Sequence, residues 1–532
     1  MLAHDKSIRF HPLWVLAVLP KIGYTFTLFF VIFSLFVSPL CLYKFLHYDN
    51  RVCLFTLYRK TQMSKPITTK KFATNVIISL TVQIVSLAVG FVLNLVVPKF
   101  IDEYQYSYWQ TYLLYVGYVG VLHFGLLDGL VLRYSQYDYE EIDKEAVRSQ
   151  FKALFFFTMT LSAIAIAVAL VFTEGEARYI VAFVAVGIMS KNVHTYNSYT
   201  FQITNRINKY AIIVIAQRLT YGLTVVALLA FKVNDFRFFC MADLLGDFVA
   251  TGISLCFNRG MYWGKSIPVR EAFAELKRNV FAGIILMLAN FSASLIIGSA
   301  KMIVQWHWDK LVFGKVSFSF SLANVFTTFV TAISVVLFPS LKRLDPESLP
   351  RLYKNIRAAV SLVLFGVMCA YFPGRRILEL WLPKYSESLV YLGYLLPIII
   401  FSSKVSLLTN NYLKVYRKEK SMMIVNLCSV VGGIAIFAFC AFVLDNIVAL
   451  LLSIVFVIMA NSVASEIVVF KVIGTRVIKE YFIEAVMVAA FVCIATFLPV
   501  WWGLAAYAAA YAAYCAVNYK AFGALGRKIF KK

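Results

Sequence analysis

Charged residues are scarce in this sequence. They make up 15% of the 532 residues, whereas 61% are apolar, and soluble domains usually contain about 25% charged residues. This composition excludes a water-soluble fold. Alternation of apolar and polar residues with a period of two is also missing, which argues against a membrane β-barrel.

Motifs for metal binding and for common enzyme chemistry are missing as well. The nine cysteines lie mostly in apolar segments and form no CxxC pair, and no histidine stands at ligand spacing from them. The sequence contains no GxxxxGK[ST] phosphate loop and no HExxH or GxSxG motif. We therefore expect no metal site, no cofactor, no ATP hydrolysis and no enzyme activity.

The net charge of +24 does not by itself indicate a nucleic-acid partner. Nucleic-acid binding requires lysine and arginine to gather on one folded face, whereas here they are spread between the apolar segments. A bias of basic residues toward cytoplasmic loops explains the charge instead.

What the sequence does contain is a series of apolar segments of about 20 residues, long enough for a helix to cross about 30 Å of hydrocarbon. We predict an all-α polytopic membrane protein with about fourteen transmembrane helices. The predicted spans are 72–97, 110–132, 151–173, 179–199, 210–231, 236–257, 279–303, 316–340, 354–374, 387–409, 422–444, 447–470, 480–500 and 502–519.

The distribution of basic residues predicts the orientation of these spans. Alternate loops, which contain residues such as Arg206, Arg259 and Lys342, are roughly three times richer in lysine and arginine than the opposite loops. The richer loops are expected in the cytoplasm, and the C-terminal segment from Arg527 to Lys532 with them. The opposite ends of the spans carry most of the tryptophans and are expected outside.

The order of the spans predicts how the chain is divided. Spans one to six (72–257) and seven to twelve (279–470) are expected to form two six-helix lobes around a central cavity, followed by a C-terminal helix pair at 480–519. Residues 1–71 form an N-terminal extension with a possible further span at 23–43. Met63 opens a short basic leader, so a start at Met63 and a genuine fifteenth span both remain open. No loop is long enough to fold alone, which favours a transporter or channel built within the membrane.

Several segments together carry a resemblance to a known family. They are Val97–Tyr104 followed by Tyr108–Gly120, His123–Gly129 and Leu132–Tyr134, then Phe313–Phe320, Leu337–Lys342 and Tyr412–Lys420. In their order and spacing these segments resemble the polysaccharide-transporter branch, which includes the O-antigen flippases, of the multidrug, oligosaccharidyl-lipid and polysaccharide exporter superfamily. The resemblance covers about residues 63–480.

This resemblance implies a flippase of the bacterial inner (cytoplasmic) membrane that works by alternating access. It implies an undecaprenyl-diphosphate-linked oligosaccharide as substrate, namely a repeat unit of O-antigen, capsule or exopolysaccharide. Membrane lipids and the polysaccharide polymerase machinery are the implied partners. The family often has twelve spans, so the resemblance does not explain the last helix pair. Two alternatives stay open: a drug or cation exporter of the same superfamily, and a membrane glycan polymerase or ligase.

Basic residues inside the predicted spans are candidates for binding a diphosphate. A charge near the bilayer centre costs about 2.5–3.5 kcal/mol on insertion scales, so these residues are expected to face a watery cavity or a partner. Arg218 is the first candidate, and an ion pair with Asp243 or Asp247 is its structural alternative. The further candidates, for which snorkelling to the interface is the alternative, are Lys404, Lys191 and Lys301.

Acidic and aromatic residues inside the spans suggest two more roles. Asp243 and Asp247 share one helix face and are candidates for coupling transport to H⁺ or Na⁺. Asp128 is a third candidate, although its Gly-x-x-x-Gly context favours close helix packing. Tyr115 and Tyr118, on one face with Tyr112, offer rings on which sugars would stack, with core packing as the alternative.

Overall fold

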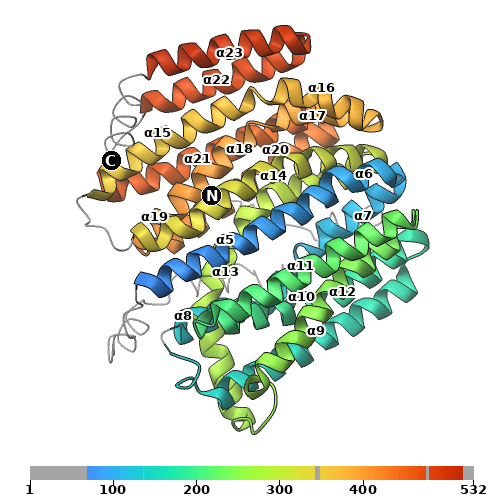
Figure 1. Cartoon of the computed structure of the whole chain (residues 1–532), viewed down its shortest axis with the longest axis vertical. Helices are drawn as coiled ribbons and strands as arrows, with labels where there is room; N and C mark the ends of the chain where they lie inside the picture. Colours follow the sequence, from blue (N-terminus) through green and yellow to red (C-terminus); the bar gives the residue numbers. More distant parts are fainter. Residues whose placement is uncertain (1–68, 136, 342–347, 475–477, 519–532) are drawn as a thin grey trace, which may run out of the picture.

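The computed structural model describes residues 69–135, 137–341, 348–474 and 478–518. Within these ranges the regular structure is helical and contains no strand (Figure 1). The predicted all-α class is therefore confirmed for the described residues. The possible span at 23–43, the start at Met63 and the segment from Arg527 to Lys532 lie outside them.

The N-terminal half of the described chain extends from α5 to α12. Its helices are α5 (Thr69–Phe91), α6 (Val97–Phe100), α7 (Glu103–Val116), α8 (Leu126–Tyr134), α9 (Lys144–Phe172), α10 (Gly175–Ile203), α11 (Ile207–Ala230) and α12 (Phe236–Phe257). The short helices between them are η1 (Val92–Val96), η2 (Val119–His123) and η3 (Arg259–Met261). The span predicted at 236–257 agrees with α12 at both ends.

The C-terminal half extends from α13 to α21, and two further helices follow it. Its helices are α13 (Val269–His307), α14 (Lys310–Leu341), α15 (Leu349–Met368), α16 (Tyr371–Trp381), α17 (Ser386–Leu395), α18 (Ile398–Lys404), α19 (Asn410–Val415), α20 (Glu419–Ala438) and α21 (Ile447–Ile473). The short helices are η5 (Pro383–Tyr385), η6 (Val405–Thr409) and η7 (Phe439–Val443). The last pair is α22 (Ile478–Phe497) and α23 (Val500–Val517).

Among the described residues, nine helices are long and apolar enough to cross a membrane, or twelve if each of three bent helix pairs counts as one span. A polytopic membrane protein is therefore confirmed. Fourteen spans would additionally require α10 and α14 to cross, and this number stays a prediction. α10 falls outside the apolar set although it has 29 residues, because polar residues such as Lys191, Asn192 and Asn197 interrupt it.

Short polar side chains fix where several helices begin. Asp102 accepts hydrogen bonds from the backbone nitrogens of Tyr104 and Gln105 at the start of α7, and Asp143 accepts one from Ala146 at the start of α9. Such a side chain satisfies backbone N–H groups that have no partner within the first helical turn. These residues lie in the loops that separate the apolar segments, so the loop composition itself positions the helices.

The second predicted span, 110–132, is broken in the structure. α7 and α8 are bent by 54° relative to each other, and between them Phe124 and Gly125 have φ angles of 49° and 81°. A Cβ added to Gly129 would lie 1.8 Å from the backbone oxygen of Asn279 on α13. The Gly125-x-x-x-Gly129 pattern therefore marks a close contact between α8 and α13.

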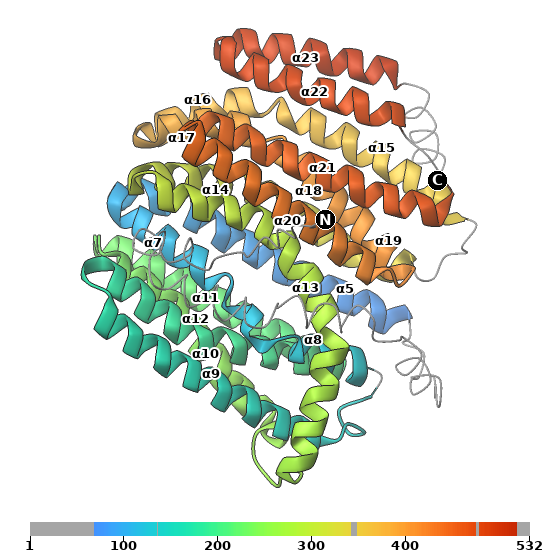
Figure 2. The same ribbon diagram turned by 180° about the vertical axis from the view of Figure 1, so that it is seen from behind.

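The helices gather into two groups that α13 connects. Figures 1 and 2 show α9 to α12 on one side of the molecule, α15 to α21 on the other, and α22 and α23 at the far edge beyond α15 and α16. α13, which has 39 residues, packs against α8 of the first group and α20 of the second. Buried rings of Tyr106, Phe318 and Tyr385 also join the halves, with Tyr106 and Tyr385 centroids 5.5 Å apart.

Candidate functional site

A buried ion cluster lies between α10 and α12. The Lys191 ammonium is 2.8 Å from an Asp243 carboxylate oxygen and 2.9 Å from one of Asp247. The aspartates are one helical turn apart on α12, so both carboxylates face α10. Their side chains are 6% and 1% exposed, whereas Lys191 keeps 22%. Lys191 is therefore the most accessible charged group of the cluster.

Neutral donors from neighbouring helices complete the cluster. The Tyr112 hydroxyl on α7 donates a hydrogen bond to Asp243 at 2.8 Å. The Ser190 hydroxyl on α10 and the Gln217 amide on α11 donate to Asp247 at 3.2 Å and 3.4 Å. The two carboxylates of α12 are thus in contact with side chains of α7, α10 and α11. A change in the charge of the carboxylates would therefore alter the contacts among all four helices.

The formal charges in this cluster do not balance. Two carboxylates and one ammonium leave one negative charge when all three are ionised, and no second cation of the described residues lies within ion-pair distance of the aspartates. A buried charge is costly unless it is paired. The arrangement is therefore suited to take up one proton or one monovalent cation.

Arg218, the first predicted phosphate ligand, does not belong to this cluster. Its side chain is exposed, and the described residues give it neither an ion pair nor a hydrogen bond. Lys191 occupies the place that the structural alternative assigned to Arg218. The pairing of Arg218 with Asp243 or Asp247 is thus not what the structure shows, and its role as a ligand stays a prediction.

Lys191 and Lys404 were expected either to bind substrate or to snorkel toward the interface. Neither snorkels in the structure: Lys191 pairs with the two aspartates, and Lys404 is 1% exposed and pairs with Glu484 of α22. An ammonium that is buried and paired in this way is not open to a ligand. Lys404 is therefore part of a second ion cluster rather than of an accessible substrate site.

The second cluster joins α15, α18, α21 and α22. Arg357 donates to Glu466 at 3.2 Å and to Glu484 at 3.0 Å, and the Ser361 hydroxyl donates to Glu484 at 2.9 Å. The charged side chains are at most 4% exposed. With Lys404 as the second cation, the formal charges balance. This cluster fastens α22 to the C-terminal half.

Lys301 on α13 is the remaining basic candidate. It is partly buried, and its ammonium lies 6.0 Å and 5.8 Å from the ring centroids of Phe313 and Phe320 on α14. Aromatic faces attract cations at such distances. Lys301 has no ion pair among the described residues, so its charge is not compensated by a carboxylate there.

The three tyrosines on one face of the second predicted span, Tyr112, Tyr115 and Tyr118, make two kinds of contact. Tyr112 belongs to the first ion cluster. The Tyr115 hydroxyl donates to Gln305 at 2.6 Å and accepts from the Trp306 indole at 3.2 Å, and the Tyr118 hydroxyl donates to the Ser294 carbonyl at 3.2 Å. Tyr115 and Tyr118 thus link α7 and the segment after it to α13, and sugar stacking on them stays a prediction.

Asp128 is buried in the first turn of α8, where α8 packs against α13. The His123 imidazole lies 3.9 Å from its carboxylate. Metal binding finds no support here, since no group of three or more His, Cys, Asp or Glu side chains in the described residues is arranged to hold a metal ion. A coupling role for Asp128 stays a prediction.

Sequence reasoning missed Arg357 and the bond from Tyr112 to Asp243. Arg357 lies one turn inside the predicted span 354–374, so from the sequence it resembles the basic residues that flank the ends of membrane spans. Its partners Glu466 and Glu484 are 109 and 127 residues away, so no local pattern announces the contact. The presence of Glu466 and Glu484 inside predicted spans was the available signal, because intramembrane carboxylates need partners.

Comparison with known proteins adds to these observations. Residues 132–378 match a family described as a polysaccharide biosynthesis protein. The structure is similar to that of the lipid II flippase MurJ in an inward closed conformation, with a TM-score of 0.62, 10% identity, and coverage of 84% of this chain and 99% of that chain. It is also similar to an inward-facing multidrug resistance MATE family transporter of the MOP superfamily, with a TM-score of 0.54, 12% identity, and coverage of 78% and 98%. No curated protein gives a significant sequence match.

The fold is thus of the class that these transporters of known structure share, and its N-terminal half contains a buried ion cluster whose formal charges do not balance. Within this class, the family match confirms the resemblance that the sequence motifs indicated, to the polysaccharide-transporter and flippase family. The two structural neighbours are described as a flippase and a multidrug resistance transporter.

Proposed function

We propose that this chain moves an undecaprenyl-diphosphate-linked oligosaccharide from the cytoplasmic to the outer leaflet of a bacterial inner membrane by alternating access. The family match supports a polysaccharide substrate. The likeness to a lipid II flippase supports the fold needed to carry a lipid-linked one. Cations inside the membrane-crossing helices supply positive charge for the diphosphate.

The observation that carries the proposal is the position of Lys191 between two buried carboxylates. A lysine held by Asp243 and Asp247 has its charge satisfied and is not free for a phosphate. When a proton or Na⁺ enters the cluster, the carboxylates hold Lys191 less strongly, and its partly exposed ammonium is free to turn toward the substrate. Cation uptake and diphosphate binding would then favour each other, as coupling between two sites requires.

Arg218 and Lys301 extend this basic set. Arg218 is exposed, and Lys301 is partly buried beside aromatic rings. A guanidinium binds phosphate oxygens in a bidentate manner, whereas an ammonium acts as a point charge. We assign Arg218 to direct phosphate binding and Lys301 to attraction of the anionic substrate.

The test is a flipping assay in proteoliposomes with a fluorescent undecaprenyl-diphosphate-linked oligosaccharide and an imposed H⁺ or Na⁺ gradient. We expect Asp247→Asn to remove the response to the gradient, a loss of about 5–150-fold as is usual for coupled sites. Glu379→Gln, which changes a carboxylate that pairs with Arg375 on α16, is the matched control and should leave flipping unchanged.

The same vesicles separate this function from drug export. An exporter would move a cationic dye such as ethidium and leave the lipid-linked oligosaccharide in its original leaflet, and that result would refute the proposal. A response to the gradient that survives in Asp247→Asn and in Asp243→Asn would refute the coupling role while leaving the substrate assignment intact.

A further inference from the structure

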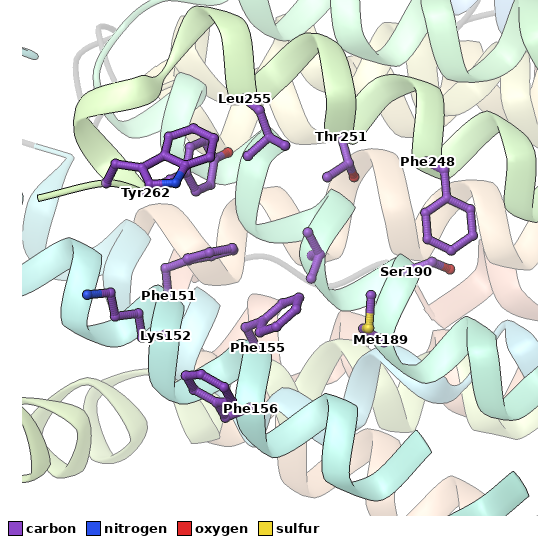
Figure 3. Close-up of a pocket in the computed structure, with 12 residues that line it drawn as sticks. Phe151, Lys152, Phe155, Phe156, Met189, Ser190, Phe248, Thr251, Leu255 and Tyr262 are labelled. Atoms are coloured by element: carbon purple, nitrogen blue, oxygen red, sulfur yellow. The ribbon is translucent and has the colours of Figure 1, made fainter. Parts of the chain in front are cut away.

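An aromatic crevice of about 360 Å³ lies in the N-terminal half, outside the ion cluster. Figure 3 shows its walls: Phe151 and Phe155 of α9 face Thr251 and Leu255 of α12, with Met189 and Ser190 of α10 nearby. Both α9 and α12 pack against α10. The crevice is therefore a gap between two helices whose floor is a third.

We expect the open side of the crevice to contact lipid rather than water. α9 and α12 are both apolar enough to cross a membrane, and each contributes a strongly exposed aromatic side chain to the lining, Phe156 at 59% and Phe248 at 45%. Exposed apolar side chains on a membrane-crossing helix contact acyl chains. A volume of this size lies at the lower end of the range of protein ligand sites, about 300–1,000 Å³.

One end of the crevice is basic. Lys152 lines it and donates a hydrogen bond to Ser266 at 2.8 Å, and Trp263, in the same loop as Ser266, also belongs to the lining. Arg148 fixes the loop by donating to the backbone carbonyls of Gly260, at 2.7 Å, and Lys265. Side-chain hydrogen bonds thus hold the loop in place at the basic end of the crevice.

Residues 258–278, which include this loop and the start of α13, also combine basic and exposed apolar side chains. Residues 258–278 contain five basic and two acidic residues, and Val269 and Phe273 at the start of α13 are 86% and 67% exposed. Exposed apolar side chains among basic ones are typical of a segment that lies at an anionic membrane surface. An apolar crevice that opens beside such a segment matches a molecule with an apolar tail and an anionic head.

We propose that this crevice binds one acyl chain of an anionic glycerophospholipid, whose headgroup phosphate lies at Lys152 and the 263–266 loop. The inference depends on the membrane-embedded fold and not on which substrate is carried. Ser190, on the floor, donates to Asp247 of the ion cluster. The bound chain therefore contacts a residue that also holds a carboxylate of that cluster.

Photolabelling of the full chain tests the proposal. The protein is reconstituted in nanodiscs of phosphatidylcholine with a small fraction of phosphatidylglycerol that carries a diazirine near the end of one acyl chain, and labelled peptides are mapped by mass spectrometry. We expect labels on Phe155, Met189 and Phe248, which unlabelled phosphatidylglycerol removes and additional phosphatidylcholine does not. Lys152→Gln should lower the labelling about five-fold, the effect of one basic residue near an anionic headgroup.

Two tryptophan variants test whether labelling depends on the crevice itself. Thr251→Trp fills the crevice and should abolish labelling there. Leu223→Trp adds the same side chain to an exposed position of α11 and should leave labelling unchanged. Lys152→Gln changes a polar side chain outside the core, so it remains informative if Thr251→Trp lowers the yield of folded protein.

Three outcomes would overturn the proposal. Labels spread evenly over the exposed faces of α9 and α11 would mean ordinary boundary lipid. Equal competition by phosphatidylcholine would remove the anionic headgroup from the assignment. Preferential competition by an undecaprenyl-diphosphate compound would assign the crevice to the transported substrate instead.

Discussion

The two halves of the molecule each contain a buried ion cluster, and the clusters differ in charge. In the N-terminal half, Asp243 and Asp247 share the single ammonium of Lys191. In the C-terminal half, two carboxylates face two cations, and the charged side chains are almost fully buried. A balanced and inaccessible cluster stabilises a fixed arrangement of helices. The N-terminal cluster keeps one negative charge in excess and one partly exposed group, and this difference underlies the coupling role that we propose for it.

The largest expected effect follows removal of Arg357. Arg357→Ala would leave two buried carboxylates with only Lys404 as a counter-charge, and breaking a buried pair in this way costs about 3–5 kcal/mol of stability. We expect little folded protein in the membrane and a lower unfolding temperature in detergent.

A second change should restore part of that loss. Adding Glu466→Gln to Arg357→Ala balances the charges again, so the double variant should be more abundant than the single one. Arg376→Ala, which removes an arginine that is 57% exposed and pairs with Glu379, is the control with an expected change below about 1 kcal/mol. Wild-type abundance of Arg357→Ala would contradict a structural role for this cluster.

Removal of Lys191 should cost less than removal of Arg357. Lys191→Gln leaves two aspartates without an ammonium, but one of them is able to bind a proton, so we expect a loss of about 1–3 kcal/mol. Thermal unfolding of the purified variant measures it. The double variant Lys191→Gln with Asp247→Asn should recover part of the lost stability without recovering transport, and recovery of transport would contradict the functional assignment of this cluster.

A smaller effect is expected at Tyr112. Tyr112→Phe removes one hydrogen bond to Asp243 and keeps the ring, which corresponds to about 0.5–1.5 kcal/mol of stability. Tyr104→Phe, at a position that is 48% exposed, is the matched control. A change at Tyr112 no larger than that at Tyr104 would show that Asp243 does not depend on this donor.

The smallest effect on stability is expected at Arg218, together with a large effect on transport. Because Arg218 is exposed and has no ion pair among the described residues, Arg218→Ala should change stability by less than about 0.5 kcal/mol. Flipping should be severely reduced in Arg218→Ala and partly reduced in Arg218→Lys, since an ammonium does not bind phosphate in a bidentate manner. Normal flipping in both variants, with Lys232→Ala as the control, would remove Arg218 from the site.

The sequence predicted the helices better than their ends. The span 236–257 agrees with α12 because polar residues flank it on both sides, and Asp235 caps its start. α13 begins ten residues before the predicted 279, because its first turns mix charged residues with exposed apolar ones and do not resemble a membrane span. A continuous apolar segment identifies the part of a helix inside the membrane, whereas the helix itself continues beyond it.

The sequence identified the three charged residues of the N-terminal ion cluster as intramembrane charges, but it did not predict how they pair. Lys191, Asp243 and Asp247 were all identified because intramembrane charges are rare. Their association was not, since the sequence placed Arg218 beside the aspartates and Lys191 near a span end. The difference depends on how far each helix is rotated about its axis. Tertiary packing sets that rotation, and the spacing of residues within one span does not reveal it.

The contact between α8 and α13 has a mechanical consequence. Gly125, Gly129 and Gly283 bring the two backbones so close that neither helix has room to slide past the other without separating. A few residues further along α13, Asn426 of α20 donates to the Ala289 carbonyl at 3.0 Å. α13 is thus held to α8 of the N-terminal half near Gly283 and to α20 of the C-terminal half near Ala289. A rotation of the two halves relative to each other must therefore bend α13 between Gly283 and Ala289, which is about two turns of helix, or break one of these two contacts. It must also change the hydrogen bonds of Tyr115 and Tyr118 to α13 farther along the same helix.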